Sequence, residues 1–195
     1  MKLMFLRIII LLVLLTNGIV SAISQQSVRF LPTDSRIIIT GTSNLHDWEE
    51  KVEQFDVALV MKFEKNEILG IDHVHFSCKS GSISSDNSIM TNKTMDALQT
   101  DKYPEIVFTM ASIDKLTSAN GKFSGVLTGD LTLAGVTKRI SIAFTGHHEN
   151  NRIKITATKD ININDFKIKP PTAMMGALKT GENVLISFQL QFSVS

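Results

Sequence analysis

The stretch VLISFQLQFSV, residues 184–194, places a large apolar residue at every second position from Val184 to Val194. Side chains in a β-strand point alternately to the two faces of a sheet, so this period of two predicts a strand with one buried face. The stretch is long for a strand of a small sandwich. Long, strongly tilted strands are instead typical of a barrel of about eight strands.

The same alternation recurs along most of the chain and predicts about eight or nine strands. No helix-rich segments separate them, which argues against a parallel α/β sheet. We therefore expect an all-β fold, an extended antiparallel barrel of about eight strands that is either filled by its own side chains or hollow enough for one ligand. The other alternating runs are residues 55–63, 74–78, 106–110, 123–133, 140–144 and 153–163, with a β-branched apolar run at 37–39.

Turn residues and one short helix are expected between the strands. The segments 119–121, 134–135 and 149–151 carry the Asn and Gly residues that hairpin turns favour. A helix is predicted around residues 92–99, with Thr91 or Asn92 as its cap and with Pro104 preventing its continuation. Residues 44–54 fit either a helix or a strand.

The first 22 residues have the pattern of a removable signal peptide. Lys2 and Arg7 precede or flank an apolar run at residues 8–15, and Val20-Ser21-Ala22 forms a small-residue cleavage site. The apolar run is too short for a comfortable membrane span, and no later segment is long enough. We expect residues 1–22 to be the signal peptide and residues 23–195 to form a single domain.

Composition excludes several classes of protein. The hydrophobic share of 43% excludes a disordered chain. The formal net charge is +1 and falls to −1 without Lys2 and Arg7, whereas a nucleic-acid binder needs a basic surface. Cys78 is the only cysteine, so no internal disulfide can form. Its parity places it on the buried face of its strand, where a thiol is unreactive.

The histidines and carboxylates give only a weak signal for chemistry. His73 and His75 share one strand face at a spacing that can chelate a metal, but that face is opposite Val74 and is expected to meet solvent. His147-His148 is expected at a turn, and the charged run 49–51 on a solvated surface. We therefore expect no metal site.

Several segments, in a fixed order along the chain, carry a family resemblance. Together they resemble the YceI-like family of exported bacterial lipid-binding proteins over roughly residues 27–194. The resemblance implies an extended lipocalin-like β-barrel that holds an isoprenoid or other lipid chain in an apolar interior, outside the cytoplasm. It supplies no matched catalytic residue. The segments are Gly41-Thr42-Ser43 with Leu45-His46-Asp47-Trp48, Ser82-Ile83 before Met95 and Leu98, Tyr103–Phe108, Gly129–Lys138, and Asp165-Phe166 to Gly181.

We therefore expect a periplasmic or secreted, non-enzymatic protein, without a cofactor, that binds a lipophilic molecule such as an isoprenoid, quinone-like or fatty-acyl chain. Gly125 and Gly129 fall on the inward face, where they either leave ligand space or mark a bend. The head group is expected at one mouth, near His46, Asp47, Trp48, Met174 and Met175. The expected lining is Val57, Leu59, Met61, Val74, Phe76, Phe108, Phe123, Leu127, Leu131, Ile142, Phe144, Ile155, Ile186 and Phe188.

Two alternative hypotheses remain open at this point. A filled barrel would serve a structural or protein-interaction role, and its interior would lack a continuous cavity. A metal-dependent enzyme would need His73, His75 and either His147 or His148 to converge on one point. An edge strand or the apolar loop at residues 170–178 could support a homodimer, although no sequence feature requires one.

Overall fold

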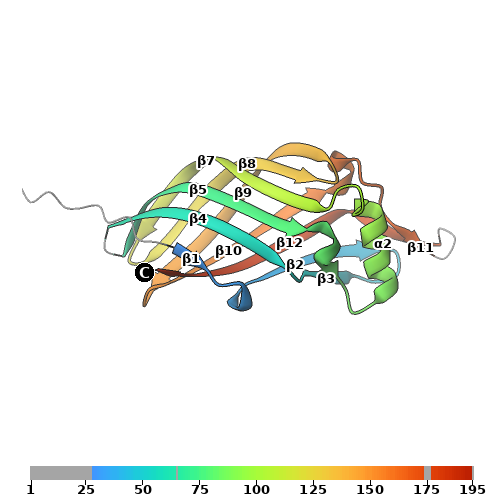
Figure 1. Cartoon of the computed structure of the whole chain (residues 1–195), viewed down its shortest axis with the longest axis horizontal. Coiled ribbons are helices and arrows are strands. Elements are labelled where there is room, and N and C mark those ends of the chain that lie inside the picture. The colour runs from blue at the N-terminus through green and yellow to red at the C-terminus, as the bar shows by residue number, and fades with distance from the viewer. Residues whose placement is uncertain (1–27, 65, 174–176, 195) are drawn as a thin grey trace, which may run out of the picture.

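The computed structural model describes residues 28–64, 66–173 and 177–194, so the expected signal peptide at residues 1–22 lies outside the described residues. Within them the chain is almost entirely β-structure with one α-helix (Figure 1). The elements are β1 Val28–Phe30, β2 Arg36–Ser43, β3 Trp48–Val52, β4 Phe55–Glu64, β5 Glu67–Lys79, β6 Ile83–Ser84, α2 Ser88–Leu98, β7 Glu105–Ala119, β8 Lys122–Leu133, β9 Val136–Glu149, β10 Arg152–Asn162, β11 Thr172–Ala173 and β12 Leu178–Val194, with 3-10 turns at Pro32–Asp34, Ser80–Ser82 and Ile163–Phe166.

All strands pair antiparallel in one sheet, in the order β4-β5-β7-β8-β9-β10-β12-β2-β3-β6, with β1 and β11 paired to β12. Eight of them are at least eight residues long: β2, β4, β5, β7, β8, β9, β10 and β12. The predicted antiparallel barrel of about eight strands is therefore confirmed in its long strands. The short strands β1, β3, β6 and β11 bring the total to twelve in the described ranges.

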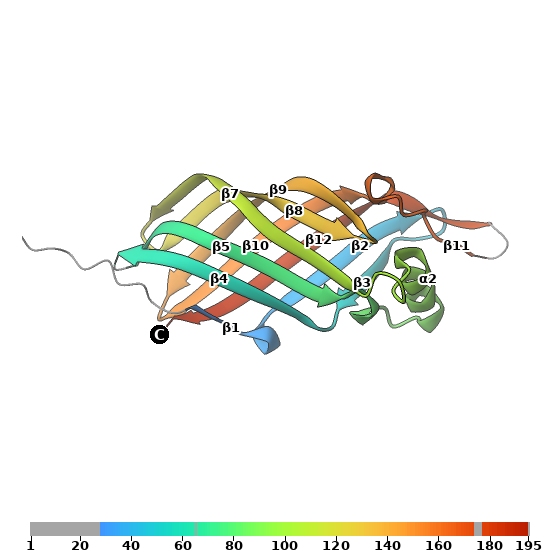
Figure 2. The same cartoon turned by 45° about the horizontal axis from the view of Figure 1, so that its top comes forward.

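The sheet curls into an elongated barrel because the chain itself joins its two edges (Figure 2). Strand β3 lies near one end of the strand order and β4 at the other, yet only residues 53–54 separate them. Beside this junction, β1 also packs against β4 through Phe30 and Phe55, whose ring centroids lie 5.6 Å apart. The two edge strands β4 and β6 are not hydrogen-bonded to each other, but these connections and contacts enclose the interior.

The three predicted hairpin turns are confirmed. Each connects consecutive long strands with two residues, at positions 120–121, 134–135 and 150–151. In every case both central residues have positive φ, from 47° at Ala134 to 76° at Gly135. This is the geometry that matches the twist of the flanking strands.

Helix α2 is longer at its N-terminus than predicted. It begins at Ser88 rather than near residue 92, and its cap is Asn87 rather than Thr91 or Asn92. The Asn87 side chain accepts hydrogen bonds from the backbone amides of Ile89 and Met90, which supplies partners that the first turn otherwise lacks. In both views α2 lies across the end of the barrel opposite the C-terminus (Figures 1 and 2).

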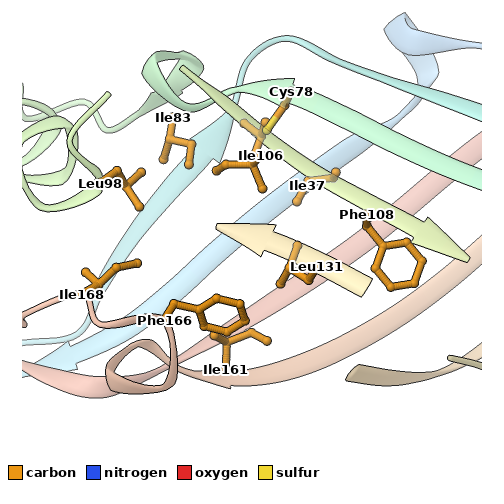
Figure 3. Packing of buried hydrophobic residues seen from close by; sticks show 11 residues of the cluster. Ile37, Cys78, Ile83, Leu98, Ile106, Phe108, Leu131, Ile161, Phe166 and Ile168 are labelled. Carbon is orange, nitrogen blue, oxygen red and sulfur yellow. The ribbon is translucent and has the colours of Figure 1, made fainter. Parts of the chain in front are cut away.

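Buried side chains form two clusters, one toward each end of the barrel. The cluster at the end without α2 is tightly filled and contains Met61 and Ile153, both with 0% exposure, together with Phe63 and Phe192. The cluster near α2 is formed by residues from many elements, including Ile37, Cys78, Leu98, Phe108 and Leu131 (Figure 3). The interior is therefore closed by packing at one end and covered by the helix at the other.

Candidate ligand-binding cavity

A continuous cavity of about 470 Å³ occupies the barrel from beneath α2 down to the filled cluster. A single water needs only about 10–15 Å³ by the same measure, so this space holds far more than a few waters. Its wall is almost entirely apolar. Residues such as Ile37 on β2, Ile106 and Phe108 on β7, and Leu131 on β8 project into the same interior (Figure 3). The geometry does not favour the filled-barrel hypothesis.

Most of the side chains that the sequence predicts to line the barrel interior do line this cavity. They all lie at the alternate positions of the long strands that face inward. Those that line it are Val57, Leu59, Val74, Phe76, Phe108, Leu127, Leu131, Ile142, Phe144, Ile155, Ile186 and Phe188.

Met61 and Phe123 have the same parity but do not line the cavity. Met61 is 0% exposed and Phe123 is 3% exposed, and both pack into the filled cluster. Alternation identifies the inward face of a strand, but it does not show how far along the strand the interior becomes solid. The lining is therefore shorter than predicted.

The two inward glycines make room for aromatic rings rather than for a ligand. A Cβ atom on Gly129 would collide with the ring of Phe108, and one on Gly125 would lie 3.0 Å from Cζ of Phe144. Gly129 also lies beside a register shift between β7 and β8. Both glycines thus serve packing and bending of the strand.

At the mouth, the structure places two of the five predicted residues against the cavity. His46 and Trp48 line it, whereas Asp47 is exposed and outside the lining. Met174 and Met175 lie outside the described residues. The Trp48 ring covers Gly41, and its Nε1 donates a hydrogen bond to the carbonyl oxygen of Thr42 at 3.0 Å. This indole therefore forms a fixed part of the rim.

Glu50 is a lining residue that the sequence reasoning missed. The charged run 49–51 was expected on a solvated surface, yet Glu50 is only 3% exposed and faces the cavity. Burial raises the pKa of its carboxyl group, partly offset by a hydrogen bond from Thr94 Oγ1 at 2.7 Å. The signal was available, because Trp48, Glu50 and Val52 share one parity on β3.

Cys78 and Lys159 also face the cavity. Cys78 is 6% exposed, and burial raises its pKa to about 12, so the thiol stays neutral at physiological pH. This agrees with the expected inert thiol. Lys159 lies between Ala157 and Ile161 on the inward face of β10 and is half-buried.

The histidines do not form the cluster that a metal-dependent enzyme would need. His73 and His75 stack on each other with ring centroids 6.3 Å apart, and His147 pairs with Glu149. His148 lies at the end of β9, just before the turn at residues 150–151, and its ring is buried against Phe63. Among the described residues, no group of three or more His, Cys, Asp or Glu side chains could hold a metal ion.

None of the helices in the described ranges is long and apolar enough to cross a membrane.

Comparison with known proteins adds the family context. A family model described as a YceI-like domain matches residues 28–192. A UPF0312 protein of Pseudomonas putida (strain W619) is 37% identical over 84 residues. That alignment covers 40% of this chain and 42% of the relative, so the match spans about two fifths of the relative's length.

Two solved structures share the fold at low sequence identity. A polyisoprenoid-binding domain from Saccharophagus degradans superposes with a TM-score of 0.66 at 12% identity, covering 88% of this chain and all of that domain. BcnA of Burkholderia cenocepacia superposes with a TM-score of 0.65 at 15% identity, covering 83% of this chain and 98% of the other. These similarities establish the shape of the barrel.

Proposed function

Because the chain belongs to the YceI-like family, we propose that it is an exported, non-enzymatic carrier that holds a lipophilic molecule inside its barrel. The observation that carries this proposal is the apolar cavity of about 470 Å³, a size typical of small-molecule sites, which span about 300–1,000 Å³. The polyisoprenoid-binding domain with the same fold supports an isoprenoid, quinone-like or fatty-acyl chain as the ligand.

Apolar burial supplies the affinity of such a carrier. Enclosing about 300 Å² of a lipid tail contributes on the order of 7 kcal/mol before the costs of association. Few polar contacts are then needed, which suits a wall dominated by Ile, Leu, Val and Phe. Residues 1–22, with the pattern of a signal peptide, support function in the periplasm or outside the cell.

The experiment is native mass spectrometry of the purified mature protein, followed by organic extraction of anything released. We expect a stoichiometric lipid that dissociates on extraction. If the purified protein carries no lipid and also fails to bind added quinones, prenyl lipids and fatty acids, the proposal is contradicted.

The variant Leu127→Arg tests the interior location. Leu127 lines the cavity, and an arginine there buries an unpaired guanidinium or fills the space. We expect retained lipid to fall by at least about tenfold.

Thr128→Arg is the matched control, because Thr128 is next in the strand on the outer face and bonds to Ser141 at 2.9 Å. A folded Leu127→Arg protein that keeps as much lipid as Thr128→Arg would argue against an interior site.

A further inference from the structure

Among the residues that the structure describes, Glu50 is the one buried acidic side chain of the cavity wall. Strand β3 presents it inward between Trp48 and Val52, and its neighbour across the ladder, Ile39, lines the cavity as well. With 3% exposure the carboxylate has almost no access to bulk water. A charged group is rarely left in such a place unless a partner satisfies it.

Thr94 on α2 supplies only part of that partnership. Its hydroxyl donates to Oε1 of Glu50 at 2.7 Å, which ties the helix to the rim. Within the described part of the chain, this is the only hydrogen bond to the carboxylate. An ionised carboxylate has room for about four donors, so it can accept further hydrogen bonds from a molecule in the cavity.

The sign of the charge determines which head group fits. An ionised carboxylate only accepts hydrogen bonds, and it repels another anion strongly where water is scarce. Because burial raises the pKa of Glu50, the pH has to lie above that raised pKa for this preference to act. A hydroxyl, amide or amine at the end of a lipid chain donates a hydrogen bond to it. A fatty-acid carboxylate or a phosphate ester meets a like charge instead.

The lysines near the cavity do not reverse this preference. Lys159 pairs across the sheet with Ile186, Ile186 pairs with Ile39, and Ile39 pairs with Glu50. Three strand spacings therefore separate the backbones of Lys159 and Glu50, or about 14 Å. Its side chain is half-buried and Lys93 is exposed, so both ammonium groups can reach water on flexible stems. Glu50 is too short and too deeply placed to do the same.

We propose that Glu50, held in place by Thr94, receives the head group of the bound lipid and selects apolar chains that end in a hydrogen-bond donor over chains that end in a carboxylate or phosphate. This inference rests on the proposed lipid-carrier function. It adds the class of head group and the residue that recognises it.

The test compares oleyl alcohol, oleamide and oleylamine with oleate and oleyl phosphate, which share one tail and differ only at the head. The delipidated mature protein is titrated with each compound at alkaline pH, where the Glu50 carboxyl is ionised in spite of its raised pKa. Binding is read from the emission of Trp48, the single tryptophan, which lies at the rim. We expect the three donor heads to bind at least about tenfold more tightly than the two anionic heads.

Glu50→Gln should reduce that preference to less than about threefold, because the neutral amide no longer repels an anion. Glu49→Gln is the matched control, since it removes the same charge from the neighbouring exposed residue and should leave the preference intact. The ranking measured on the native protein decides the question even if Glu50→Gln folds poorly.

Equal or tighter binding of oleate by the native protein overturns the inference, as does a full preference in Glu50→Gln. If all five compounds bind equally well, the head-group inference fails while the lipid carrier stands. If none binds, by emission or by native mass spectrometry, both proposals fail.

Discussion

The Cys78 thiol provides a residue-scale test of how dry the cavity wall is. Burial raises its pKa from 9.0 to about 12, so the folded protein holds the thiol proton at pH values where the unfolded chain has released it. A group with a raised folded pKa stabilises the fold fully below the unfolded pKa. That stabilisation is lost as the pH rises from 9.0 toward 12.

We therefore expect the free energy of unfolding of the native protein to fall more steeply above pH 9.0 than that of Cys78→Ala. By about pH 10 the extra loss is on the order of 1 kcal/mol. Urea unfolding of both proteins at a series of pH values measures it, and the variant corrects for lysine and tyrosine titration. Parallel curves would show that the thiol is hydrated in the folded state.

Single residues also show where sequence reasoning stops. Glu50 was expected on a solvated surface and His148 at a turn, and both side chains are buried. The charges of residues 49–51 are typical of a solvated surface, but the parity of Trp48 and Val52 on the same strand indicates an inward Glu50. For His148 no local signal shows that its ring packs on Phe63, because these residues are distant in sequence.

At the scale of elements, the N-cap of α2 can be tested directly. Asn87 accepts hydrogen bonds from two amides of the first helical turn, and Asn87→Ala removes both. We expect this substitution to lower the free energy of unfolding by about 1 kcal/mol. Because α2 lines the mouth of the cavity, ligand affinity should fall as well.

Asn92→Ala is the control for this prediction. Asn92 lies exposed inside α2, where alanine has the higher helix propensity, so we expect a change within a few tenths of a kcal/mol. Thermal unfolding of the two variants separates a capping effect from the loss of an asparagine. Equal destabilisation would assign no special role to Asn87.

The elements themselves were largely predictable. Long strands carry their own period of two, and five of the six positive-φ positions in the hairpin turns are Asn or Gly, Ala134 being the exception. The short elements were not, because β3 has five residues and β6 and β11 have two each. Such segments are fixed by the neighbours with which they pair. The start of α2 was missed because Asn87 and Asn92 are equally plausible caps in the sequence.

At the scale of the whole molecule, the two halves of the interior should respond differently to the same change. Phe63 is 3% exposed in the filled cluster and does not line the cavity, whereas Phe188 does line it. Phe63→Ala should lower the free energy of unfolding by about 3–5 kcal/mol. Phe188→Ala should cost about half of that or less, because one side of its ring already faces open space.

The same pair should behave oppositely toward ligand. Phe188→Ala should weaken lipid binding, and Phe63→Ala should leave it nearly unchanged in the folded fraction. Urea unfolding and titration with an oleyl lipid measure the two effects. Equal effects of both substitutions on stability and on binding would contradict the division of the interior.

This division could not be predicted from the sequence. Alternation assigned an inward face to Met61 and Leu59 alike, but only Leu59 lines the cavity. Whether a barrel is hollow depends on how side chains from several strands meet and on the register shifts between β7 and β8 and between β4 and β5. These are properties of the assembled sheet, and no single strand encodes them.

The separation between a filled end and a hollow end has a consequence for how such a chain can diverge. Side chains in the solid half must keep their volumes, because any change there threatens folding. Side chains around the open half can be exchanged at a smaller cost to folding, and each exchange alters the shape of the cavity that receives the ligand. Descendants of one ancestral barrel can therefore acquire new ligands through substitutions at the helix-covered end, without passing through an unstable intermediate.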